Sequence, residues 1–66
     1  MRIHVNGQER DLATSTSLAS FVESLGLDVR KVAIERNLEI VPRSAYGATM
    51  LHDDDRLEIV NFVGGG

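Results

Sequence analysis

The residues best suited to chemistry in this 66-residue chain are the three consecutive glycines at its end, Gly64, Gly65 and Gly66. Glycine has no Cβ, so a run of glycines can enter a narrow slot in extended form, and the carboxylate that follows it is unhindered. A frayed chain end is the ordinary explanation of such a tail. The functional interpretation is that residues 1–63 form a rigid domain and residues 64–66 a flexible arm, presented to active sites on other proteins.

Other reactive side chains are few and poorly spaced for catalysis. The sequence contains no cysteine, which excludes disulfides, thiolate metal sites and a cysteine nucleophile. His4 and His52 lack neighbours at ligand spacing, so we interpret both as surface or rim residues. Asp53-Asp54-Asp55 lacks the spacing of a calcium loop and is interpreted as a solvated turn. We find no motif of a serine hydrolase, a phosphate-binding loop or a zinc protease. The sequence predicts no bound cofactor or metal and no enzyme activity.

The size and charge of the chain exclude further classes of function. A 66-residue domain buries only about 60% of the surface of its unfolded chain, which leaves little volume for a deep catalytic pocket. The formal net charge of −3 disfavours nucleic acid and favours docking on a basic partner surface. The chain has no signal-peptide pattern and no apolar run of about 18–20 residues. We therefore expect a cytoplasmic protein that does not enter a membrane.

The first half of the chain predicts a hairpin followed by a helix. Apolar and polar residues alternate over 1–6, as in a half-buried strand, and Asn6-Gly7 is a strong hairpin signal before a returning strand at 8–12. A cluster of capping residues at 13–17 precedes an apolar stripe at helical spacing, made by Leu18, Phe21, Val22 and Leu25. Gly26 is placed to end this helix in the left-handed conformation.

The second half predicts strands at 32–36 and 38–41, a short one at 50–52 and a last one at 57–63. Pro42 marks an edge or an end because it cannot donate to a ladder. With the first half, this gives the order ββαββ. One helix across one face of a mixed sheet of four to five strands buries the most apolar surface available to these elements, which is the α+β layout called β-grasp, or ubiquitin-like.

The last strand predicts a docking surface beside the glycines. Leu57, Ile59 and Asn61 share one face, and Glu58, Val60 and Phe62 share the other, because side chains alternate along a strand. If the first face packs on the helix, Val60 and Phe62 are exposed apolar groups next to the tail. We therefore predict that Glu58, Val60 and Phe62 form a partner-docking face.

The chain resembles the ThiS family of sulfur carriers. The resemblance rests on Asn37, on Ile40-Val41-Pro42-Arg43, on the acidic turn at 53–55 and on a strand that leads into Gly65-Gly66, and it extends over the whole length. The sequence departs from the family at Asp54, where glycine is common. This residue belongs to a turn and not to the reactive end.

The resemblance implies a role as a protein co-substrate. A ThiF-like adenylating enzyme would use ATP to convert the Gly66 carboxylate into an acyl adenylate, because a carboxylate is a poor electrophile. A sulfur donor protein would then supply the sulfur of a Gly66 thiocarboxylate, and a ThiG-like thiazole synthase would take that sulfur into the thiazole of thiamin. Gly64 and Gly65 would thread into the partner.

Three other functions remain open at this stage. The small subunit of molybdopterin synthase would share fold and tail chemistry, but those proteins tend to be longer and often have prolines before the final glycines, which residues 61–63 lack. A ubiquitin-like modifier would be joined through Gly66 to lysines. A regulatory or RNA-binding β-grasp module is disfavoured by the negative charge and the scarcity of aromatic residues.

Overall fold

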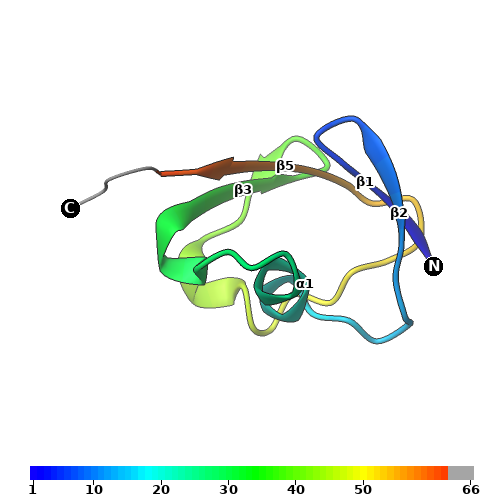
Figure 1. The fold of residues 1–66 in the computed structure, drawn as a ribbon, viewed down its shortest axis with the longest axis horizontal. Helices are drawn as coiled ribbons and strands as arrows, with labels where there is room; N and C mark the ends of the chain where they lie inside the picture. The colour runs from blue at the N-terminus through cyan, green and yellow to red at the C-terminus, as the bar shows by residue number, and fades with distance from the viewer. Residues whose placement is uncertain (63–66) are drawn as a thin grey trace.

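A computed structural model describes residues 1–62, which form two layers, a five-stranded sheet and a helix packed across one of its faces (Figure 1). The strand order is β2-β1-β5-β3-β4; β1 and β5 are parallel, and the other neighbours are antiparallel. The elements are β1 (Arg2–Val5), β2 (Gln8–Asp11), α1 (Leu18–Ser24), β3 (Val32–Arg36), β4 (Glu39–Ile40) and β5 (Arg56–Asn61), with 3₁₀ turns at Val29–Lys31 and Arg43–Ala45. This is the predicted mixed sheet with one helix.

Both hairpins close through two-residue turns. In the first, Asn6 and Gly7 have φ values of 50° and 83°, as a type I′ turn requires. In the second, Asn37 and Leu38 have φ values of 52° and 70°. Leucine in the left-handed region costs roughly 1–2 kcal/mol because its Cβ approaches the following carbonyl. The second turn therefore carries local strain that the first does not.

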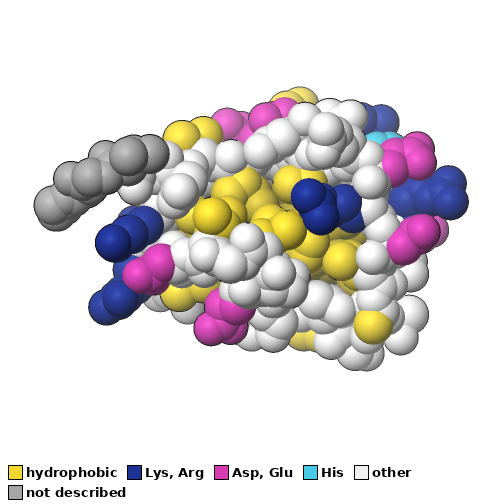
Figure 2. Space-filling view, viewed as in Figure 1, with side chains coloured by type: hydrophobic (Ala, Val, Ile, Leu, Met, Phe, Trp, Pro, Cys, Tyr) yellow, Lys and Arg dark blue, Asp and Glu magenta, His cyan; other side chains and the backbone are white. Residues whose placement is uncertain are grey.

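The helix is bounded as the sequence predicts. The Ser17 hydroxyl caps its start by accepting a hydrogen bond from the Ser20 N–H at 3.1 Å, and Gly26 follows its end with φ 78°. Hydrophobic side chains gather between the sheet and the layer formed by the helix and loops (Figure 2). This core consists of Ile3, Val5, Leu18, Phe21, Val22, Val32, Ile34, Tyr46, Leu51, Leu57 and Ile59.

The predicted strand at 50–52 is wrong. Met50 makes only an isolated bridge with Ser17, and no ladder extends from it within residues 1–62. The Leu18 N–H donates to the Thr49 carbonyl at 2.8 Å. This bond and the one that the Leu51 N–H donates to the Thr16 carbonyl at 3.0 Å form the bridge itself, and the ladder ends there because the chain continues from Leu18 as a helix.

Candidate functional site

The last described residues lie at the end of β5, which runs through the middle of the sheet (Figure 1). Leu57 and Ile59 are buried against the helix layer, whereas Val60 is 58% and Phe62 47% exposed. Glu58 is also exposed. The structure thus places the three predicted docking residues on the sheet face opposite the helix, and their role in docking stays a prediction.

The predicted reactive residues Gly64, Gly65 and Gly66 lie outside the described residues, and their assigned roles stay predictions. What the structure does establish is the path that leads to them. The Phe62 N–H donates to the Lys31 carbonyl at 2.7 Å, so pairing between β5 and the chain before β3 continues to the last described residue. The domain is therefore ordered by main-chain hydrogen bonds up to Phe62.

Neighbouring strands extend the exposed face around Val60. Ala33 lies directly opposite Val60, and both are exposed on the outer side of the sheet. On β4, Ile40 is 80% exposed and pairs with Glu35. Hydrophobic side chains are visible on the outer surface near the end of β5 (Figure 2). We call the group Ala33, Ile40, Val60 and Phe62 the outer patch.

Two carboxylates border the outer patch. Glu35 and Glu58 are directly opposite each other on β3 and β5, and both are exposed. Like charges at such a pair of positions destabilise a sheet. Neither residue takes part in a salt bridge among residues 1–62. The sheet face that carries the outer patch is therefore apolar with a negative border of two carboxylates.

Asn6 supports β5 from the side of β1. Its side-chain amide forms two hydrogen bonds with one residue of β5: the Ile59 N–H donates to Asn6 Oδ1 at 2.8 Å, and Asn6 Nδ2 donates to the Ile59 carbonyl at 3.2 Å. This amide takes the place of a further residue of β1. The sequence predicted Asn6 only as a turn residue, because a bond to a residue 53 positions away leaves no local signal.

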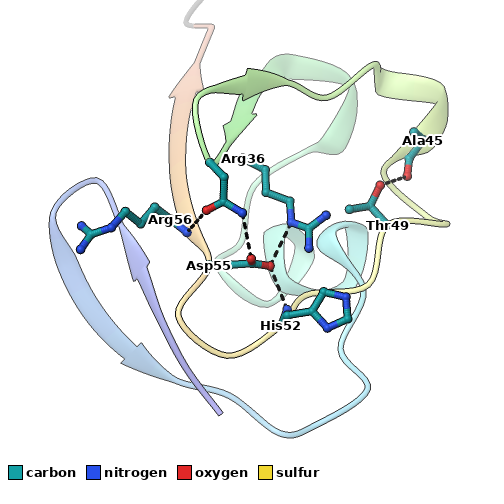
Figure 3. Close-up of polar contacts among 7 residues, drawn as sticks. Arg36, Ala45, Thr49, His52, Asp55 and Arg56 are labelled. Atoms are coloured by element: carbon teal, nitrogen blue, oxygen red, sulfur yellow. Dashed lines mark hydrogen bonds and ion pairs between the residues drawn. The ribbon is translucent and has the colours of Figure 1, made fainter.

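Asp55 is a buried hub that the sequence did not reveal. Its carboxylate accepts hydrogen bonds from the His52 N–H at 2.8 Å, Arg36 Nε at 2.9 Å and Asn37 Nδ2 at 3.0 Å (Figure 3). Asn37 in turn accepts a hydrogen bond from the Arg56 N–H at 2.9 Å. The hub joins the β3–β4 turn to the turn before β5. The interpretation of residues 53–55 as a solvated turn is therefore wrong for Asp55, which is only 5% exposed.

The charge of Asp55 is retained despite its burial. Burial raises the pKa of the Asp55 carboxyl, but the hydrogen bonds from the His52 N–H, Asn37 and Arg36 outweigh it, and the pKa lies below its usual value. In the same turn Asp54 has φ 69°, in the left-handed region that glycine adopts without a steric penalty. The departure from the family at Asp54 therefore keeps a left-handed turn.

The remaining polar candidates do not converge. His4 is half-buried in β1, and the exposed His52 engages Asp55 through its backbone. Among residues 1–62, no three His, Asp or Glu side chains gather closely enough to hold a metal ion. In this part of the chain no helix has the length and apolar character to span a bilayer.

Comparisons with known proteins agree on one family. The model of the ThiS family matches residues 3–66. The sulfur carrier protein ThiS of Bacillus subtilis is 35% identical over 65 residues, which cover 97% of this chain and 98% of that protein. The crystal structure of the thiamine biosynthesis protein ThiS from Geobacter metallireducens superposes with a TM-score of 0.83 at 32% identity, and the match covers all of both chains. The β-grasp prediction is thereby confirmed.

A second kind of relative is much longer. The thiazole synthase of Paramagnetospirillum magneticum is 50% identical over 66 residues, and that of Magnetococcus marinus is 44% identical over the same length. The match takes in all of this chain but only 20% of each of those proteins. In both relatives, a domain like this one is therefore part of a polypeptide about five times its length.

Proposed function

The chain belongs to the ThiS family, and on that premise we propose that it is a sulfur carrier of thiamin biosynthesis whose reactive group is the Gly66 carboxylate. The observation that supports this most directly is the full-length match to carriers of the same size. The position of Gly64, Gly65 and Gly66 in the sequence, shortly after β5 ends at Asn61, agrees with it.

The proposed chemistry takes place on partner proteins. In the active site of a ThiF-like enzyme, the Gly66 carboxylate attacks the α-phosphate of ATP. Pyrophosphate leaves, and Gly66 becomes an acyl adenylate. A persulfide on a sulfur donor protein then displaces AMP and forms an acyl disulfide. A thiol then attacks the donor protein's sulfur in this S–S bond. Gly66 is left as a thiocarboxylate, and a new disulfide joins the thiol to the donor protein. In this scheme the chain is a protein co-substrate and not an enzyme.

The described residues contribute recognition. Glu58, Val60 and Phe62 form the proposed docking face, since they lie on the uncovered side of the sheet and shortly before the glycines in the sequence. Ordering each glycine in a partner slot costs about 1–2 kcal/mol. Contacts between the docking face and the partner offset this ordering cost. A carrier therefore needs both a glycine tail and a docking face. Gly64 and Gly65 are the proposed threading residues.

The thiazole synthase relatives favour the thiamin pathway over the molybdopterin alternative. In those proteins, a domain like this one is part of a polypeptide named for thiazole synthesis. We therefore propose that a ThiG-like thiazole synthase is the acceptor of the sulfur.

The acceptor can be tested with the thiocarboxylate form carrying labelled sulfur. Incubation with the cognate thiazole synthase and its substrates should yield a thiazole that contains the label. The control replaces the synthase with the large subunit of molybdopterin synthase, which should take up little label. Preferential transfer to the molybdopterin enzyme would contradict the assignment to thiamin.

A further inference from the structure

Successive residues of β5 direct their backbone N–H and C=O groups alternately toward β1 and toward β3. This alternation determines which neighbour the backbone of Asn61 faces. The Asn6 N–H donates to the Leu57 carbonyl at 2.9 Å, and Ile59 bonds the Asn6 side chain, so both β5 residues face the β1 side. The Phe62 N–H faces the opposite side and donates to Lys31. Because neighbouring residues alternate, the N–H and C=O of Asn61 point toward the β1 side.

No strand occupies that side at Asn61. β1 ends at Val5, and the chain turns away at Asn6-Gly7, so β5 extends past the β1–β2 hairpin (Figure 1). The Asn6 amide ends the ladder at Ile59, and no other residue between 1 and 62 pairs with the Asn61 backbone there. An unpaired strand edge of this kind is a template for an added strand.

The side chains around this edge indicate the chemistry of an added strand. Val60 and Phe62 flank Asn61 and project from the outer face, where they offer an apolar contact. Glu58 and Glu35 are opposite each other in a hydrogen-bonded antiparallel pair, a position at which Cα atoms are typically about 5.5 Å apart. A Lys or Arg on the partner would relieve their repulsion.

We propose that the thiazole synthase docks by adding an extended segment to the β5 edge at Asn61, with apolar side chains on Val60 and Phe62 and a basic side chain toward Glu58. This rests on the proposed function. The long relatives support this partner, because a domain like this one and the rest of a thiazole synthase share one polypeptide there, which keeps the two at high effective concentration. Main-chain bonds supply affinity, and the alternate side chains supply specificity.

Amide hydrogen exchange tests the pairing in the unaltered protein. The exchange rate at the Asn61 amide is measured free and in complex with the cognate thiazole synthase. We expect exchange at Asn61 to slow at least about tenfold, as for a newly formed backbone hydrogen bond. The Glu9 amide is the control: the Leu12 N–H donates to Met1, so alternation turns the Glu9 N–H to the open edge of β2. Equal rates at Asn61 in both states would overturn the proposal.

Two proline variants test the same bond by affinity. Asn61→Pro removes the proposed donor without removing a bond to β3 and should weaken binding to the synthase about fivefold, the effect of one net hydrogen bond. Glu9→Pro removes an outward N–H far from the outer patch and should bind as the wild type does. Equal affinity of a folded Asn61→Pro protein would contradict strand addition, and if that variant fails to fold, the exchange measurement decides.

The outcome also separates this inference from the proposed function. If the wild-type protein acquires a sulfur at Gly66 and passes it to the synthase while the Asn61 amide remains unprotected, strand addition is wrong and the carrier function stands. If the protein neither acquires sulfur nor binds the synthase, both are wrong.

Discussion

At the scale of single residues, Asp55 has the largest structural consequence. Its carboxylate joins two turns that are 18–19 residues apart in the sequence, and its pKa lies below the usual value because three donors surround the charged form. A carboxyl whose pKa is lower in the folded than in the unfolded state stabilises the fold above its ordinary pKa of about 4. That contribution is lost as the pH falls through the pKa of the folded state.

We therefore predict that Asp55→Asn lowers the free energy of unfolding by about 2 kcal/mol at neutral pH, since it removes charged hydrogen bonds. The variant should also show a shallower loss of stability between about pH 5 and pH 2. Denaturant titrations over this pH range measure both effects. Asp54→Asn, which changes an exposed residue of the same turn, is the control. Identical pH profiles for wild type and Asp55→Asn would show that the hub does not act through its charge.

Substitutions at the exposed apolar residues of β5 test the proposed docking face. Val60→Asp or Phe62→Asp should weaken binding to the adenylating enzyme at least about tenfold, because a charge in an apolar contact is left unpaired. The unfolding free energy should change by less than about 1 kcal/mol, as is usual for exposed positions. Met50→Asp, at another exposed apolar residue, is the control. Loss of stability in proportion to loss of binding would mean that these side chains serve the fold.

At the scale of elements, the two hairpin turns form a natural comparison. Both adopt positive φ at two successive residues, but Gly7 stands where the second turn has Leu38. Leu38 is 90% exposed, so it contributes little packing to offset its strained backbone. We predict that Leu38→Gly raises the unfolding free energy by about 1 kcal/mol and that Gly7→Leu lowers it by a similar amount. Thermal unfolding measures both; a destabilised Leu38→Gly protein would contradict the strain argument.

Local patterns predicted the elements well, because each depends on nearby residues. Asn6-Gly7 predicted the first hairpin, and the stripe from Leu18 predicted the helix. The strand expected at 50–52 did not form, because the segment that it pairs with becomes a helix directly after Ser17. Asp55 was mistaken for a surface residue since its partners Arg36 and Asn37 lie far away in the sequence. Long-range hydrogen bonds leave no spacing pattern.

At the scale of the whole molecule, the two faces of the sheet have different roles. One face packs against α1 and forms the core, and the other leaves the outer patch and its negative border uncovered (Figure 2). Strand alternation in β5 was sufficient to predict that Leu57 and Ile59 are buried and that Glu58, Val60 and Phe62 are exposed. It could not predict Ala33 and Ile40 as their neighbours, because this requires the order of the strands.

The central claim is that the Gly66 carboxylate carries sulfur. The most direct test is intact-mass measurement after incubation with the cognate adenylating enzyme, ATP and a sulfur donor. The wild-type chain should gain the mass difference of one sulfur replacing one oxygen, and a variant with alanine appended after Gly66 should fold normally and gain nothing. An unchanged wild-type mass with an active enzyme, or equal modification of the extended variant, would contradict the account.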